Sequence, residues 1–183
     1  MADAIVVGDG PTGLQAALLL GKNGIGTRVY GQDETYLHDA MLYNYLGIEE
    51  MHGSEFAEIA RRQAEQYGAD LIDGEVVAAA ETADGMRIET GDGTTDTADY
   101  LVLAEGDARE VAADIGVEFD GDTVDTDRNG RTSIENVYAG GWTARDLKVQ
   151  AAISVGDGAA IALDILSREK GEPFHDFDVP GDD

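Results

Sequence analysis

The sequence predicts an α/β fold of three layers, with a parallel central sheet and a small antiparallel β-meander. Short runs such as Ala4–Val7 and Leu101–Ala104 are continuously apolar, which is typical of strands buried on both faces. Helical patterns alternate with these runs, as in a parallel sheet built from βαβ units. In the middle of the chain, β-rich segments are separated by Asp84-Gly85 and Asp92-Gly93, which are typical hairpin turns.

The first 30 residues predict one βαβ unit. The strand Ala4–Val7 leads into the glycine-rich loop Gly8–Gly13. A helix is predicted from Leu14 to Asn23, and Gly24 ends it. The second strand follows at Thr27–Tyr30, and a crossover of this kind is right-handed in nearly all proteins.

The later elements are predicted from their local patterns. Residues 32–53 have no clean period and form a long connection. Ser54 is predicted to cap a helix that reaches Tyr67, with apolar residues on one face. The predicted strands lie at about 71–72, 75–80, 86–90, 95–99, 101–104 and 136–139, and a long helix is predicted from Ala151 to Arg168.

Length and composition favour a single folded domain. The chain has 183 residues, of which 43% are apolar and 27% charged, and it contains 24 glycines but only 3 prolines. These values allow a sizeable core and many tight turns. We expect one domain over residues 1–170 and a loosely held acidic tail over residues 171–183.

The net charge is strongly negative. Asp and Glu number 38 against 12 Lys and Arg, which gives a net charge of −26. Such a charge repels itself in dilute buffer, but at molar salt the Debye length falls to about 3 Å. The composition therefore predicts a protein of a high-salt cytoplasm. Nucleic acid is excluded as a partner, because the chain has no basic stripe.

Several kinds of site are excluded by the residues present. The chain has no cysteine, so disulfides, thiolate metal sites and a dithiol redox centre are excluded. His38, His52 and His175 lie far apart without carboxylates at ligand spacing, so no metal site is expected. The chain has no run of 18 apolar residues, so no membrane span is expected. The start of the chain reads directly as a strand rather than a signal peptide, which favours the cytoplasm.

The glycine-rich loop predicts a dinucleotide-binding site. Gly8, Gly10 and Gly13 have the G-x-G-x-x-G spacing, with a strand before them and a helix after them. The first glycine permits the tight turn, the second admits a pyrophosphate, and the third lets helix and strand pack closely. Pro11 and Thr12 belong to this loop and are predicted to bind the cofactor with it. Free N–H groups and the dipole of the following helix would hold the phosphates. No lysine follows in the pattern of a mononucleotide-binding loop.

One element of the usual dinucleotide site is missing. An acidic residue at the end of the second strand normally binds the adenosine ribose, and the equivalent position here is about Gly31. Asp33 and Glu34 lie just beyond it, and Asp33 is our candidate substitute. The alternative is that both belong only to the acidic surface.

Five segments together resemble the thioredoxin reductase family of flavoproteins, and the resemblance runs from Asp3 to about Leu166. The matching segments are Gly8–Leu14, Tyr43–Gly53, Leu101–Gly106, Thr132–Gly141 and Val149–Ala151.

The resemblance implies a Rossmann-like FAD-binding fold with FAD as the cofactor. It implies that the glycine loop binds the FAD pyrophosphate and that Gly106 ends a cofactor-binding strand. Gly141 would let the ribityl chain pass. The helix that begins at Gln150 and Ala151 would aim its N–H groups at the flavin pyrimidine edge, which stabilises negative charge there. Family members pair through their FAD domains, so a homodimer is also implied.

The sequence departs from this family in four respects. The family inserts an NADPH-binding domain in mid-chain, whereas only residues 106–127 occupy that interval here. The Cys-x-x-Cys centre is absent, so this chain cannot reduce disulfides through thiols of its own. Trp142 replaces the aspartate that binds the ribityl chain, and a lost charged hydrogen bond costs about 1.5–3 kcal/mol. Glu105 replaces a threonine near the cofactor. Trp142 either stacks on the flavin or fills the space that a lost flavin left.

Two functions follow from these residues. The first is a minimal FAD-binding flavoprotein oxidoreductase that passes electrons between a donor and a partner protein or acceptor. Diffusible NAD(P)H or another protein would supply the electrons, and no catalytic acid or base is predicted. The alternative is a catalytically degenerate nucleotide-binding sensor or assembly module. Trp142 and Glu105 favour that alternative.

Overall fold

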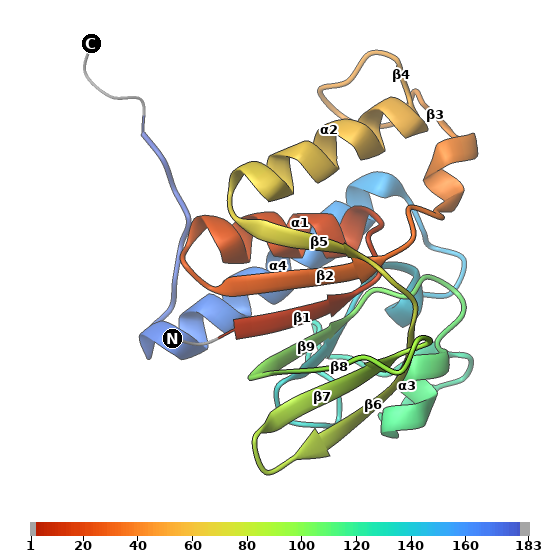
Figure 1. Cartoon of the computed structure of the whole chain (residues 1–183). Coiled ribbons are helices and arrows are strands. Elements are labelled where there is room, and N and C mark those ends of the chain that lie inside the picture. Colours follow the sequence, from red (N-terminus) through yellow and green to blue (C-terminus); the bar gives the residue numbers. More distant parts are fainter. Residues whose placement is uncertain (1–2, 180–183) are drawn as a thin grey trace.

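A parallel five-stranded sheet separates two layers in the computed structural model, which describes residues 3–179 (Figure 1). Helices cover one face of the sheet, and an antiparallel meander covers the other. The predicted three-layer fold is confirmed. The strand order is β12 (Val137–Ala139), β9 (Tyr100–Leu103), β1 (Asp3–Val7), β2 (Gly26–Gly31) and β5 (Ala69–Asp73), all parallel.

The central strand β1 supplies both cores, because successive side chains of a strand point to opposite faces. Ala4 and Val6 lie in the core beneath the helices α1 (Pro11–Lys22) and α4 (Ala151–Lys170). Ile5 and Val7 lie in the second core beneath the meander. All four are nearly or fully buried, which explains why this strand reads as continuously apolar.

The second layer is the antiparallel meander. Its strands pair in the order β6-β7-β8, as the two Asp-Gly turns predict. Helix α3 packs against β6 on this side. The elements of this layer are β6 (Val76–Thr82), β7 (Gly85–Thr90), β8 (Thr95–Ala98) and α3 (Glu110–Ile115).

The long connection after β2 has structure of its own. It contains η1 (Tyr36–Asp39) and a hairpin of β3 (Met41–Leu42) with β4 (Met51–His52). Helix α2 (Gly53–Gln66) follows. The prediction that Ser54 caps this helix is wrong. His52 is the N-cap, and its Nδ1 accepts a hydrogen bond from Ser54 N at 3.3 Å.

Short elements were the ones that sequence patterns missed. Helix α3 has six residues, too few to show a helical period, and α1 begins at its proline rather than three residues later. The hairpin of β10 (Phe119–Asp120) with β11 (Thr123–Val124) fills the rest of the interval before β12. The short η2 (Gly141–Ala144) then leads towards α4.

Residues 174–178 of the acidic tail contact the helical layer. Lys22 on α1 forms ion pairs with Asp176, at 3.0 Å, and with Asp178. Phe174 N donates a hydrogen bond to Ser167 Oγ at 3.0 Å, and the Phe174 ring packs against the helical core. Residues 180–183 of the predicted tail lie outside the described residues.

Helices α1 and α4 cross at very close range. A Cβ on Gly158 of α4 would overlap Thr12 O and lie 3.1 Å from Ala16 N. Both are backbone atoms, which cannot rotate away as a side chain would. In residues 3–179, no helix is both long enough and apolar enough to cross a membrane.

We predict opposite effects from one substitution at two positions of α4. Gly158→Ala should lower the free energy of unfolding by about 1–3 kcal/mol, because the new Cβ forces the two helices apart. Gly156→Ala, two residues earlier and exposed, should raise it by about 0.5–1 kcal/mol through helix propensity. Urea unfolding of both variants measures the two changes. Equal effects would contradict the close crossing.

Candidate dinucleotide-binding site

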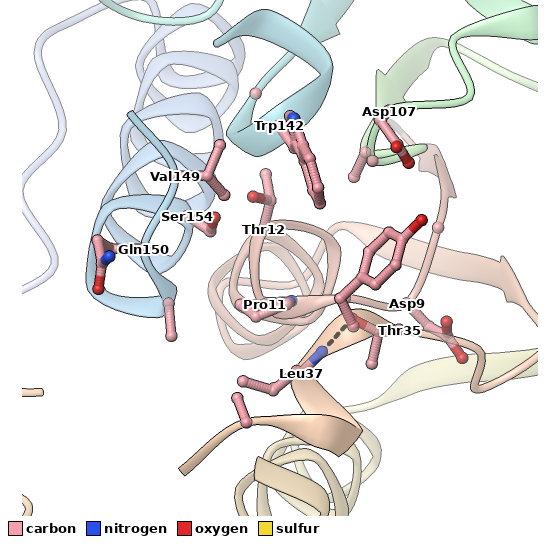
Figure 2. A pocket seen from close by; sticks show the side chains of 18 of the residues that line it. Asp9, Pro11, Thr12, Thr35, Leu37, Asp107, Trp142, Val149, Gln150 and Ser154 are labelled. Carbon is pink, nitrogen blue, oxygen red and sulfur yellow. Dashed lines mark hydrogen bonds between the residues drawn. The ribbon is translucent and has the colours of Figure 1, made fainter. Parts of the chain in front are cut away.

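A cavity of about 450 Å³ lies at the carboxyl ends of the parallel strands, where the chain leaves β1, β2, β9 and β12. Open α/β sheets bind ligands at this edge, at the point where strand order reverses. Figure 2 shows Asp9 and Gln150 on opposite sides of Pro11 and Thr12. The lining residues are Gly8–Thr12, Glu34–Leu37, Ala40–Leu42, Asn44, Ala104–Asp107, Gly140, Trp142, Val149–Ala151 and Ser154.

The three glycines of the loop have different neighbours. Gly8 has φ +102°, and a Cβ there would overlap Ala104 O at the end of β9. A Cβ on Gly13 would overlap Gly8 O. At Gly10 the nearest protein atom to such a Cβ would be Thr35 Oγ1, at 3.7 Å. The protein itself therefore needs the first and third glycines, whereas the second leaves open space that faces the cavity.

Backbone N–H groups at the start of α1 are available for a ligand. The N-cap residue is Gly10, no side chain caps the helix, and its first turn has no acidic residue. Among the described residues, the N–H groups of Gly10, Thr12 and Gly13 have no hydrogen-bond partner. These groups and the helix dipole favour an anion, such as a pyrophosphate.

The start of α4 faces the same cavity. Gln150 is its N-cap residue, but no side-chain hydrogen bond caps the helix, and its first turn also lacks acidic residues. Gln150 Oε1 instead accepts a hydrogen bond from Asn44 Nδ2 at 2.6 Å. This bond holds the β3–β4 connection against α4. Two uncapped helix N-termini therefore meet in one cavity.

The charged side chains of the cavity are all acidic. Asp9, Glu34, Glu105 and Asp107 line it, and no Lys, Arg or His within residues 3–179 does. Glu105 turns its carboxylate to α3, where Oε2 accepts from Val111 N at 2.8 Å and Oε1 from Ala112 N at 3.0 Å. Burial raises the pKa of Glu105, although these two hydrogen bonds oppose the rise. Glu105 therefore caps a helix and does not direct its charge at the cavity.

Trp142 and Tyr36 form an aromatic pair that lines the cavity. Their ring centroids lie 5.2 Å apart, and the rings are tilted by 51°. Arg109 fixes the backbone beneath Trp142, because Nη2 donates to Trp142 O at 2.7 Å and Nε to Thr143 O at 3.1 Å.

Arg145 is not free for a ligand, since it forms a bidentate ion pair with Asp157 at 2.6 Å.

Most of the residues predicted for the site line this one cavity, but three of the predicted residues do not. Gly13 lies inside the turn of the loop, and Gly141 donates its N–H to Asp157 at 3.0 Å. Asp33 faces His38 at 3.0 Å and Arg61 at 3.8 Å. The predicted residues that line the cavity are Gly8, Gly10, Pro11, Thr12, Gly106, Trp142, Gln150 and Ala151.

Several lining residues were not predicted. Thr35–Leu37, Ala40–Leu42 and Asn44 come from the long connection, where no period indicated structure. Ser154 lies one turn into α4. The G-x-G-x-x-G spacing does not specify the residue at position 9, so the motif gave no sign of a role for Asp9. Among the described residues, no group of three or more His, Asp or Glu side chains is arranged to hold a metal ion.

The fold and the cavity define a dinucleotide-binding α/β protein of the Rossmann-like type. The sequence profile of the pyridine nucleotide-disulphide oxidoreductase family matches residues 2–106 and residues 42–156. The chain belongs to this family, and its fold is that of thioredoxin reductases. Members of the family are FAD-binding flavoproteins, which confirms the predicted cofactor class.

Curated relatives are longer than this chain. A thioredoxin reductase from Aquifex aeolicus is 31% identical over 111 residues, which are 57% of this chain and 33% of that protein. A ferredoxin–NADP reductase from Lactococcus lactis is 28% identical over 111 residues, or 57% of this chain and 35% of that protein. The chain thus spans about a third of the length of these relatives.

Solved structures show the same fold. The atypical thioredoxin reductase TRi from Desulfovibrio vulgaris Hildenborough has a TM-score of 0.86 and 21% identity, covering 95% of this chain and 100% of that chain. A thioredoxin reductase from Gloeobacter violaceus has a TM-score of 0.88 and 17% identity, covering 98% of this chain and 99% of that chain.

We predict that alanine separates the roles of the first two glycines. Gly10→Ala should cost about 1 kcal/mol or less in stability, but it should weaken FAD binding about 10-fold or more, because its methyl group enters the ligand's space. Gly8→Ala should lower both the stability and the FAD affinity, since its Cβ overlaps the backbone of Ala104. Thermal unfolding and FAD titration measure the two properties. Unchanged FAD affinity in Gly10→Ala would argue against this position for the pyrophosphate.

Proposed function

We propose that this chain is the FAD-binding part of a flavoprotein oxidoreductase and passes electrons between a donor and a partner protein or acceptor. The observation that carries the proposal is the meeting of two uncapped helix N-termini in one cavity, those of α1 and α4. In a chain of net charge −26, backbone N–H groups are the positive groups that this cavity offers an anion.

The residues present fit a flavin dinucleotide. The amides of Gly10 and Thr12 would hold the pyrophosphate, in the open space beside Gly10. The start of α4, at Gln150 and Ala151, would face the flavin, where a helix N-terminus favours negative charge. Bound FAD supplies the redox chemistry, and the protein supplies binding and electrostatics.

Electrons would have to come from outside this chain. The chain has no cysteine, so it holds no thiol to carry them onward. We propose diffusible NAD(P)H or a second protein as the donor. The names of the relatives support NADP chemistry, because two of them are ferredoxin–NADP reductases.

A second candidate function is a nucleotide-binding sensor or assembly module without turnover. The Trp142–Tyr36 pair favours it, because bulky rings line the cavity where the resemblance implies a ribityl-binding aspartate. If the chain is such a module, the two rings occupy space that a flavin would need. Under the first candidate, the same rings pack against the bound cofactor.

We predict that the purified chain binds FAD at one equivalent per chain in molar KCl. Because Trp142 is the single tryptophan and lines the cavity, its fluorescence should fall as FAD binds. Anaerobic NADH or NADPH should then bleach the flavin absorbance near neutral pH. The control is Gly10→Ala, which should need about 10-fold more FAD or more to reach the same quenching and the same bleaching.

The two candidates give different results. Bound FAD that dithionite reduces and that a quinone or ferricyanide reoxidises supports the oxidoreductase, and bleaching by NADH or NADPH identifies a diffusible donor. A chain that binds ADP-ribose but not FAD supports the module. A chain that binds no dinucleotide overturns both.

We further propose that the chain works in a high-salt cytoplasm and as a homodimer. The net charge of −26 supports the first proposal. Exposed apolar residues support the second, with Leu46 97% exposed and Leu147 89% exposed.

One salt series tests both statements. Between 0.1 M and 2 M KCl the melting temperature should rise, because salt screens the self-repulsion of the chain. Sedimentation in the same buffers should give twice the chain mass of 19.3 kDa. A melting temperature that falls with salt would contradict the first proposal, and a mass of one chain would contradict the second.

A further inference from the structure

Asp9 occupies the place that an acidic residue at the end of β2 would have. Gly31 ends β2, and a Cβ on Gly31 would overlap Asp9 Cγ and lie 2.5 Å from Asp9 Oδ1. The two positions therefore exclude each other. Residue 31 has no side chain because the carboxylate of residue 9 already fills that space.

The surroundings of Asp9 fix its carboxylate. The residue is only 7% exposed. Its Oδ2 accepts a hydrogen bond from Asp33 N at 3.0 Å and forms an ion pair with Arg61 of α2. Arg61 neutralises the charge that Asp9 would otherwise bring to a phosphate-binding loop.

One oxygen of this carboxylate remains available. Among residues 3–179, no donor reaches Asp9 Oδ1, whereas Oδ2 has two partners. Asp9 lines the cavity beside Gly10, whose N–H group also has no partner in the part of the chain that the structure describes. An unused acceptor thus lies next to unused donors. The described residues leave Asp9 Oδ1 outside the set of buried oxygens without a partner, so this oxygen is accessible to a ligand in the cavity.

We infer that Asp9 Oδ1 binds the hydroxyl groups of the adenosine ribose. This inference rests on the proposed dinucleotide site. In such sites the ribose is bonded directly to the pyrophosphate, so its hydroxyls lie close to the phosphate-binding amides. An acidic side chain at the end of β2 accepts hydrogen bonds from them. Here the glycine loop supplies both groups, the amides from Gly10 onward and the carboxylate from the residue before.

The same geometry disfavours Asp33 for this role. Its Oδ1 faces His38 and Arg61, and the residue does not line the cavity. Its contribution is the backbone N–H that orients Asp9, from a conformation with φ +56°. Asp33 is therefore a positioning residue for Asp9.

The test uses ADP-ribose, which carries the ribose and pyrophosphate but no flavin. In Asp9→Asn the side-chain oxygen must face the two donors Asp33 N and Arg61. The side-chain NH₂ group then takes the place of the free acceptor Oδ1. We expect ADP-ribose to bind about 10-fold more weakly. Removing the 2′-hydroxyl of the ligand should cost the native chain a similar factor and cost Asp9→Asn little more, because the two changes remove one interaction. Asp84→Asn, an exposed residue of the β6–β7 turn, is the matched control for charge.

A second test moves the acidic side chain from position 9 to position 31. Gly31→Glu alone should lower the melting temperature and weaken binding, because its side chain collides with Asp9. Asp9→Gly should bind ADP-ribose about 10- to 100-fold more weakly. The double variant Asp9→Gly/Gly31→Glu should recover most of the affinity, because it places the carboxylate on β2. A purely structural role for Asp9 predicts no such recovery.

The outcomes separate this inference from the proposed function. Native affinity of Asp9→Asn for ADP-ribose, or loss of affinity in Asp33→Asn alone, overturns the inference even if FAD binds. A native chain that binds ADP-ribose but not FAD overturns the flavoprotein proposal, while the Asp9 variants still decide the inference. A native chain that binds neither ligand overturns both.

Discussion

The close approach of backbone to backbone around the glycine loop is the constraint on which the cavity depends. Gly8 lies against the end of β9, Gly13 lies against Gly8 itself, and Gly158 brings α4 onto the first turn of α1. Each contact is too short for a side chain. Together they bring the N-termini of both helices to the same edge of the sheet, where their unpaired N–H groups point at common space.

The electrostatics of the site follow from this arrangement. Four acidic residues line the cavity without a basic one among the described residues, which would normally oppose an anionic ligand. Two of the four carboxylates have protein partners that do not line the cavity. Glu105 caps α3, and Asp9 is paired with Arg61. The chain therefore attracts an anion through fixed backbone dipoles and neutralises nearby carboxylates with local partners.

The comparison with relatives shows which part of a larger enzyme this chain corresponds to. Its fold matches thioredoxin reductases closely, but it spans about a third of the length of the curated relatives described above. The interval from Gly106 to β12 holds only α3 and a short hairpin. With no cysteine present, the redox function proposed for the chain rests on the cofactor and on outside partners.

The sequence by itself determined the parts whose signals are local. The apolar run of β1, the spacing of the glycines and the pattern of α4 predicted the sheet and the fold correctly, because each signal lies within one segment. Eight of the residues predicted to bind the cofactor line the cavity. Only the tertiary structure decided what distant residues do to one another. Asp9 fills the space above Gly31, Glu105 turns to α3, and Tyr36 meets Trp142. These contacts join segments up to about a hundred residues apart, and packing across the sheet edge, rather than any local period, brings them together.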